Sequence, residues 1–545
     1  MKYNSQAKWQ IHDIFSTPLE TSLDTSNRWY QLANALPWDK MVSEPCRTIE
    51  KIYNRTLHNA RHGAGNKPAR LIVGALIVKH DLNLSDAGTI EQIRENPYLQ
   101  YFVGLKDFSN MSIFDSSLFV SIRKRMGVEA INEIKLLLMQ ALAKKESGEQ
   151  QGKGVHEKTG IKDASGNETG EPVNSLNIPP DSTDRESFTD DDGNFHSGSL
   201  IIDATCCESE VKYPTDLDVL NDAVEVSARV AKRLGVKTGS PVPRTCEESA
   251  RGRFLEIIKK KRKSKSLIRK GINQQLYYLR RHINILVETV ARNSSSCIGL
   301  LKQKDQQFIG TCLKVYYQQK EMYDKKIHKC ADRIISVFQP HIRPIVRGKS
   351  KAKVEFGPKT GVSIVRGFTF IDRYSYDAYN ESEDLKVQVD NYVQRFGYLP
   401  VKCYADRICL NRANRKLLGD FHIQAAGKPL GRPAKEMQTA AYKQQSIQDK
   451  GVRNAVEATF GTAKRVYRAD DIRAKLPDTA DTWTALCFLA KNIRKFLKEL
   501  LFALLPKLAF PRYFLRDLSK YFCDFLFRPS YFHTMGLKWS FCGVE

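Results

Sequence analysis

One short stretch of this chain carries charged side chains at a spacing that could do chemistry on phosphate groups. It runs Arg453-Asn-Ala-Val-Glu457-Ala-Thr-Phe-Gly-Thr-Ala-Lys464. On a helix turning about 100° per residue, Arg453, Glu457 and Lys464 lie within roughly 40° of one another. An acid between two bases on one face suits a metal ion held by the acid and phosphate oxygens held by the bases. The pattern is also typical of a solvated face with salt bridges, which this stretch alone favours.

Apolar residues follow another side of the same helix. Val452, Val456 and Ala463 lie roughly 80–120° from the centre of the charged face. We therefore expect the helix to pack on a core while its charges face a cleft.

Two aspartates follow apolar runs that predict buried strands. Asp203 comes after Leu200-Ile-Ile, and Asp406 ends the predicted strand 399–405. Carboxylates at the strand ends of an open α/β sheet face the crevice where such folds bind ligands. Two acids sharing a site repel unless they hold a cation, and Mg²⁺ accepts one or two carboxylates. Either aspartate alone is more typical of a turn or helix cap.

Composition predicts a globular protein with a polyanionic partner. The chain has 545 residues, 41% of them hydrophobic, so we expect two or three domains. Lys and Arg outnumber Asp and Glu by 86 to 61, giving a formal charge of +25. Nucleic acid is the expected partner and an anionic membrane surface the weaker alternative. The 12 cysteines form no CxxC pair, so we expect reduced thiols in the cytoplasm. The first residues contain no apolar run of the signal-peptide type, and we expect no membrane spans.

The first two segments differ sharply in composition. Residues 1–145 predict a helical domain, with a helix over 71–80, a cap at Ser85 and a helix carrying Arg123. Short helices of this kind fit a helix-turn-helix DNA-binding module or a plain bundle equally well. Residues 146–198 are rich in Gly, Ser and acids, and predict a flexible acidic linker.

A third segment, residues 199–480, predicts an α/β domain that is interrupted by helices. Strands are expected at 199–205, 210–213, 354–371, 399–405 and 421–425, with helices at 384–396 and 407–418. Residues of about 220–340 predict a helical insertion whose basic run includes Lys259, Lys260, Lys261, Arg262 and Lys263. That run is either a DNA-contacting face or a solvated one. Residues 481–545 predict a final helix, 482–504, and an aromatic-rich tail.

Taken jointly, these motifs resemble the DDE transposases of bacterial insertion sequences. The resemblance is to the group whose signature is Tyr, two residues, Arg, three residues, Glu, six residues, Lys. Arg453, Glu457 and Lys464 keep that spacing. The flanking motifs that also match are Ile202-Asp203-Ala-Thr205, Tyr213-Pro-Thr-Asp216, Tyr404-Ala-Asp406-Arg407 with Asn414, and the N-terminal runs 84–104 and 114–117. The signature tyrosine is replaced by Lys450.

The resemblance implies an RNase H-like catalytic core, a mixed sheet flanked by helices, behind a helical DNA-binding domain. It implies metal-dependent cleavage at the ends of an insertion sequence and joining of the 3′-hydroxyl to target DNA. Asp203, Asp406 and Glu457 would be catalytic and bind two Mg²⁺ ions, which Mn²⁺ could replace. The residues expected to contact DNA are Arg453, Lys464, Lys450, Arg407, Lys259, Lys260, Lys261, Arg262 and Lys263. The partners implied are double-stranded DNA, as terminal inverted repeats and target, and further copies of the chain in a homodimer or larger assembly at the bacterial nucleoid.

Two rivals stay open at this point. Because Lys450 replaces the signature tyrosine, the first alternative is an inactive or repurposed DNA-binding protein derived from a transposase. A metal nuclease acting on RNA or RNA–DNA hybrids is the other alternative.

Overall fold

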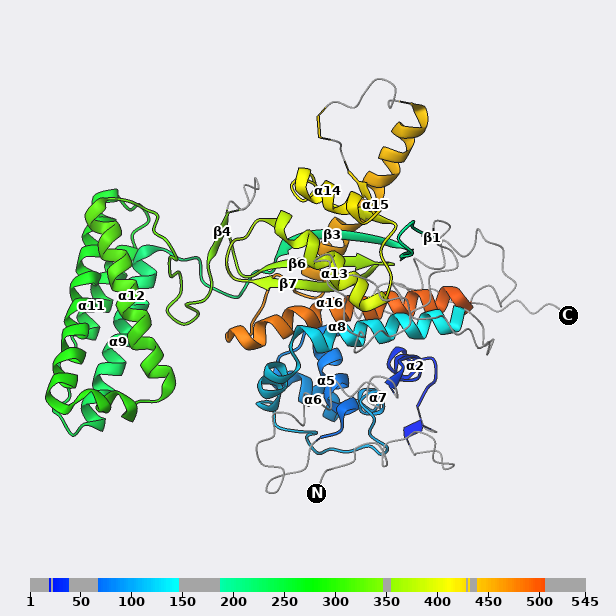
Figure 1. The fold of residues 1–545 in the computed structure, drawn as a ribbon. Coiled ribbons are helices and arrows are strands. Elements are labelled where there is room, and N and C mark those ends of the chain that lie inside the picture. Colours follow the sequence, from blue (N-terminus) through cyan, green and yellow to red (C-terminus); the bar gives the residue numbers. More distant parts are fainter. Residues whose placement is uncertain are drawn as a thin grey trace.

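The computed structural model describes residues 19–20, 23–38, 67–146, 187–346, 354–427, 430–431 and 439–504. At its centre is a five-stranded sheet in the order β7-β6-β3-β8-β9 (Figure 1). The strands are β3 (Ser199–Cys206), β6 (Lys359–Val365), β7 (Phe368–Ser375), β8 (Lys402–Tyr404) and β9 (Gln424–Ala426). Strands β3, β6 and β7 pair antiparallel, whereas β8 runs parallel to both β3 and β9. The predicted mixed α/β class is confirmed.

Helices cover both sides of this sheet. They are α8 (Leu118–Glu146), α13 (Asp384–Phe396), α15 (Ala440–Arg465) and α16 (Pro477–Leu504). Helices α8 and α16 run along each other and against β7, beneath the sheet in Figure 1. Helix α13 contacts β3 and β7, while α15 contacts β3 and β8. A short 3-10 turn, η2 (Glu381–Glu383), leads into α13.

The N-terminal helices share their core with the sheet. They are α2 (Arg28–Ala35), α5 (Ala69–Asp81), α6 (Asp86–Glu95) and α7 (Pro97–Phe102). Helix α5 is buried nearly all round, and its buried residues include Arg70, Lys79 and His80 as well as the apolar run 71–78. The predicted Ser85 cap accepts from the Gly88 N–H at 2.9 Å. One continuous apolar cluster extends from Leu19 to Phe496. The described part of residues 1–145 is therefore not packed independently of the sheet, and the DNA-binding role of this segment stays a prediction.

Arg123, which the sequence places on a basic helix, is not available to DNA in this arrangement. Its guanidinium is 4% exposed and donates to both carboxylate oxygens of Asp86 at 2.9 and 2.8 Å. Its backbone carbonyl accepts the Thr482 hydroxyl of α16. These contacts fix α8 to its neighbours, which makes Arg123 a packing residue.

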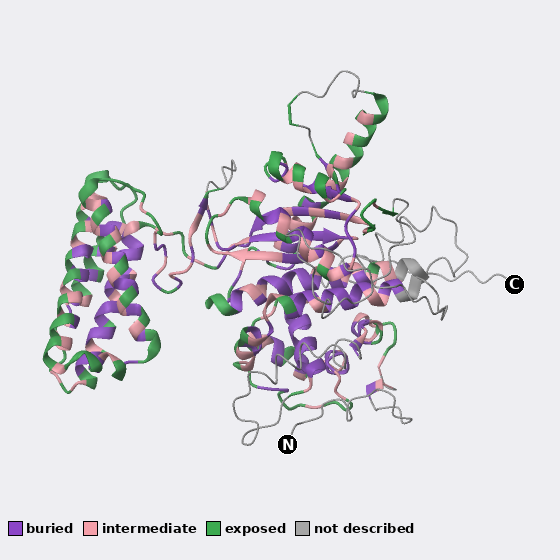
Figure 2. Cartoon of the chain, in the orientation of Figure 1, coloured by how far each residue is buried: buried purple, intermediate pink, exposed green. Residues whose placement is uncertain are grey.

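A helical insertion separates β3 from β6 and has its own core. It contains α9 (Asp216–Lys237), α10 (Glu247–Ile258), α11 (Lys265–Asn293), the 3-10 turn η1 (Ser295–Leu300) and α12 (Gln303–Lys325). Figure 2 shows buried residues inside this bundle and exposed ones around it. The bundle core includes Leu220, Leu279 and Val315 and does not join the core of the sheet.

Two predictions from the sequence are wrong in detail. Residues 210–213 are not the next strand, because the chain leaves the sheet after Cys206 and pairs only briefly with Ile472 on its way to α9. The predicted linker extends too far, because β1 (Phe188–Thr189) and β2 (Phe195–His196) form a hairpin around the Asp190–Asn194 turn. Residues 147–186 of that linker and the tail from residue 505 lie outside the described residues.

The small strands β4 (Pro344–Val346) and β5 (Val354–Phe356) form a separate antiparallel pair where the chain returns from the bundle. Among the helices of the described residues, none is long and apolar enough to cross a membrane.

Candidate functional site

Asp203 and Asp406 lie at neighbouring positions on the same edge of the sheet. The parallel register of β3 and β8 pairs Ser199 with Lys402 and Ile201 with Tyr404. Asp203 lies two residues past Ile201, within β3, and Asp406 lies two residues past Tyr404, where β8 has ended. The sequence predicts Asp203 at a strand end, but β3 continues to Cys206 because it stays paired with β6 there. The grouping of the two acids into one metal site stays a prediction.

Asp203 is partly buried among charged neighbours. Burial raises the pKa of Asp203 to about 6. The Ala204 N–H and the Arg453 guanidinium oppose this shift, whereas the Glu381 and Asp406 carboxylates add to it. Two acids raise the free energy of the Asp203 anion, so a cation is the natural complement of this site.

Helix α15 lays its charged face along the same edge. Arg453 approaches Asp406 to 3.4 Å, and each side chain is 38% exposed. The predicted apolar stripe packs inward, since Val456 and Ala463 are buried. Glu457 follows Arg453 by one helical turn and is exposed.

An ion pair fixes one end of the α15 segment beside the sheet. Before Arg453, Asp449 accepts from the Lys402 ammonium at 2.8 Å. After Glu457, Lys464 lies near the end of β3, where its charge acts on the thiols of Cys206 and Cys207. Glu457 therefore lies on the stretch of helix that passes the two aspartates.

The three carboxylates are spaced more widely than a compact metal-ligand group. Within the described ranges, the group of His, Cys, Asp or Glu side chains whose ligand atoms all lie within 4.8 Å of one another is Asp190, Asp192 and His422. Asp203, Asp406 and Glu457 do not meet that spacing.

The group at the β1–β2 turn is better explained by hydrogen bonding. Both Asp190 carboxylate oxygens accept from Asn194, at 2.7 Å from its N–H and 3.1 Å from its side chain. The His196 ring lies 3.0 Å from the same carboxylate. Three hydrogen-bond contacts therefore hold the Asp190 carboxylate in the turn.

Sequence reasoning missed one acid of the site, Glu381. It lies in the turn η2, and its charge acts on Asp203 and on the thiol of Cys409. The chain reads Glu381-Ser-Glu383-Asp384 before α13. Acids are common in the first turn of a helix, so the sequence offers no signal that separates Glu381 from its neighbours.

The predicted DNA-binding cations occupy two regions. Lys450 and Arg407 are exposed, on α15 and directly after Asp406. The run 259–263 is exposed on the turn between α10 and α11. Gly271, just beyond this turn, packs on Leu217 at the start of α9. The basic turn therefore lies at the end of the bundle where the chain enters from the sheet.

Two parts of the chain match known protein families. Residues 403–494 match a family described as a transposase DDE domain, and residues 17–125 match a transposase domain (DUF772). Asp406, Arg453, Glu457 and Lys464 all fall inside the first match. Both matched families are described as transposase domains.

Similarity to individual proteins is more limited. The protein of Rhizobium meliloti named "Uncharacterized protein ORF8 in nfe locus" is 29% identical over 126 residues, 23% of this chain. The alignment spans 55% of that relative, about half of its length. No solved structure matches the chain.

Proposed function

With residues 403–494 taken as a transposase DDE domain, we propose that this chain is a DNA transposase. It cleaves DNA at the ends of an insertion sequence and joins the freed 3′-hydroxyl to target DNA by direct transesterification. The observation that carries the proposal is the parallel pairing of β3, which holds Asp203, with β8, which precedes Asp406. Arg453 contacts Asp406 from α15, the helix that also bears Glu457.

The sheet supports an RNase H-like core for this enzyme. Three antiparallel strands, β7, β6 and β3, are followed by the parallel strands β8 and β9. The acids stand on β3 and directly after β8, at the centre of the sheet. Central strand ends are where α/β sheets open a crevice for ligands.

Two Mg²⁺ ions, or Mn²⁺ in their place, are the proposed cofactors. Divalent ions of this kind stabilise the attacking and leaving oxygens of an in-line phosphoryl transfer. Asp203 and Asp406 would hold them from the sheet, and Glu457 from α15. The acids around Asp203 fit such a cation, and Glu457 is exposed on the helix whose Arg453 contacts Asp406.

The cations around the acids are the proposed contacts to the DNA backbone. Arg453, Lys464, Lys450 and Arg407 flank the site and would bind phosphates, because charge-assisted contacts to phosphate are strong. The basic turn, Lys259, Lys260, Lys261, Arg262 and Lys263, lies at the sheet-proximal end of the bundle and would hold a more distant part of the duplex. Action at two element ends calls for at least two copies of the chain.

The test is a strand-transfer assay with Mg²⁺ or Mn²⁺ on DNA that carries the repeats flanking the coding region. We expect Asp203→Ala and Glu457→Ala each to abolish joining because each removes a carboxylate from the metal site. Glu248→Ala, which removes an exposed acid of α10, is the matched control and keeps full activity. Full activity of either site variant would refute the proposal.

A second candidate is a DNA-binding protein that has lost catalysis. Two observations favour it: Lys450 at the signature tyrosine position, and acids spaced beyond 4.8 Å. It predicts salt-sensitive DNA binding without metal-dependent nicking. Divalent-metal affinity that vanishes when the three acids are removed would count against it.

A further inference from the structure

Helix α11 has one side in the core of the bundle and the opposite side in solvent. Its buried side carries Leu276, Leu279 and Leu286, which pack into the bundle core. At about 100° per residue, five exposed residues of the opposite side lie within roughly 80° of one another. These residues, which we name the α11 stripe, are Lys270, Asn273, Tyr277, Arg280 and Asn284.

The α11 stripe lies in a part of the chain that has cations without acids. Residues 257–287 contain ten Lys or Arg residues and no Asp or Glu. Like charges along one helix repel, and this repulsion destabilises the folded state unless a polyanion lies against them. Within the described ranges, neither Lys270 nor Arg280 forms an ion pair, so their charges stay available to a partner.

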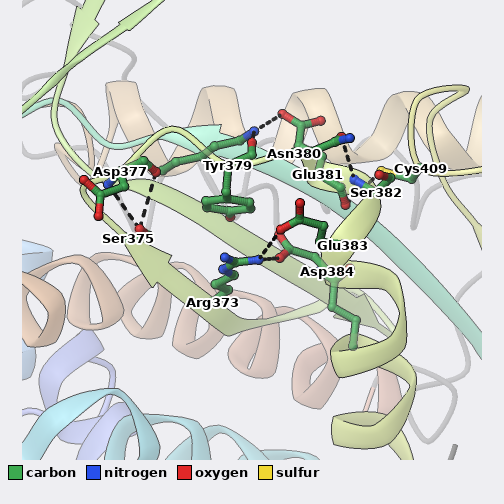
Figure 3. Close-up of polar contacts among 12 residues, drawn as sticks. Arg373, Ser375, Asp377, Tyr379, Asn380, Glu381, Ser382, Glu383, Asp384 and Cys409 are labelled. Atoms are coloured by element: carbon green, nitrogen blue, oxygen red, sulfur yellow. Dashed lines mark hydrogen bonds and ion pairs between the residues drawn. The ribbon is translucent and has the colours of Figure 1, made fainter. Parts of the chain in front are cut away.

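Other cations of the chain are paired with carboxylates. On α12, Lys320 lies 2.5 Å from Asp324, one helical turn away. In the sheet, Arg373 of β7 binds Asp384 at 2.8 Å, as Figure 3 shows. Pairs within one helix are typical of a solvated face, and the α11 stripe lacks the acids to form them.

Tyr277 stands in the middle of the α11 stripe with 63% of its surface exposed. Asn273 precedes it by about one helical turn, and Arg280 follows it by about one turn. Lys, Arg, Asn and Tyr are all side chains that hydrogen-bond to the phosphates and sugars of DNA. The stripe therefore combines the positive charge and the hydrogen-bond donors that a DNA backbone requires.

We propose that the α11 stripe is a DNA-backbone surface of the helical insertion, which binds duplex DNA together with the basic turn 259–263. The inference rests on the proposed function for the choice of DNA as the partner and extends it to the bundle. Lys270 follows the basic turn by about two helical turns, so the two surfaces are continuous along the chain. From Lys270 to Asn284 the helix rises about 21 Å. That rise matches roughly six base pairs of DNA.

The experiment measures binding of the full chain to a short DNA duplex at several salt concentrations. We expect the double variant Lys270→Ala/Arg280→Ala to lower the slope of log affinity against log salt by about two, because two phosphate contacts are lost. The matched control, Lys320→Ala/Lys325→Ala, removes two cations of the same bundle that are paired with acids, and leaves the slope unchanged.

Tyr277→Ala gives a second, uncharged readout of the same surface. We expect it to weaken DNA binding several-fold without changing the salt slope, because the loss of a neutral contact releases no counterion. Thermal unfolding checks that each variant stays folded. If the double variant melts early, the single variants Lys270→Ala and Arg280→Ala replace it, each lowering the slope by about one.

The outcomes separate this surface from the proposed enzyme. Equal slopes for the two double variants would overturn the inference, since overall charge would then explain binding. A change in binding to an RNA duplex but not to DNA would overturn it too. If Asp203→Ala keeps strand-transfer activity while the salt slope still depends on the α11 stripe, the proposed function fails and the DNA surface stands.

Discussion

At the scale of single residues, Lys450 is where this chain differs from the signature of the DDE transposases it resembles, which has a tyrosine at that position. It is exposed on α15, one turn before Arg453, on the helix that also bears Glu457. A tyrosine at this position would offer a ring for stacking on a base, whereas a lysine offers a charge for a phosphate. The substitution therefore exchanges one kind of DNA contact for another.

We expect Lys450→Ala to weaken DNA binding uniformly across sequences and to reduce the slope of log affinity against log salt by about one. The reason is the loss of one phosphate contact and its released counterion. Fluorescence anisotropy at several salt concentrations measures both. Lys237→Ala serves as the control, because Lys237 is an exposed cation at the C-terminal end of α9 in the helical bundle. Equal slopes for Lys450→Ala and the unaltered chain would remove Lys450 from the DNA interface.

Three of the candidate site residues could be predicted from the sequence, because each stands in a recognisable local pattern. Asp203 and Asp406 each follow an apolar run, and Glu457 stands at helical spacing from Arg453. Glu381 could not be predicted, because its place depends on contacts with Lys359 and Cys409 that are remote in the sequence.

At the scale of elements, the edge strand β7 depends on two asparagines from the helices beneath it. Asn132 of α8 donates to the Ile371 carbonyl at 2.8 Å and accepts its N–H at 3.3 Å. Asn492 of α16 does the same for Thr369, at 3.0 Å in both directions. These side chains satisfy backbone groups that an edge strand would leave unpaired.

We expect Asn492→Ala to lower the free energy of unfolding by about 1–3 kcal/mol, because it leaves a buried N–H and carbonyl of Thr369 without a partner. Urea unfolding measures the change. Asn454→Ala, at an exposed position of α15, is the control and shifts stability by less than about 0.5 kcal/mol. A similar loss for both variants would contradict the role given to Asn492.

Elements were predictable where periodicity and caps agree. The helix over 384–396 has the predicted bounds, and the Ser85 cap is found as expected. Residues 210–213 alternate as a strand would, yet they connect the sheet to the bundle. That outcome depends on where the insertion leaves the sheet, which no local pattern records.

At the scale of the whole molecule, the chain forms two separately packed bodies, and Asp203 and Asp406 belong to the one that contains the sheet. The sheet with its helices shares one core, and the bundle has another. Strand β3 ends at Cys206, and the chain then leads to α9 in the bundle, which Figure 1 shows beside the sheet. A duplex bound across this connection would meet charges of both bodies, and the +25 net charge favours that encounter.

The central claim is that Asp203, Asp406 and Glu457, far apart in the chain, hold divalent ions together. Anomalous diffraction from a Mn²⁺ complex of the full chain with DNA tests it most directly. The account predicts Mn²⁺ between these three side chains, with oxygen ligands at roughly 2.0–2.3 Å. Mn²⁺ bound only at Asp190, Asp192 and His422, with the three acids still apart around DNA, would contradict it.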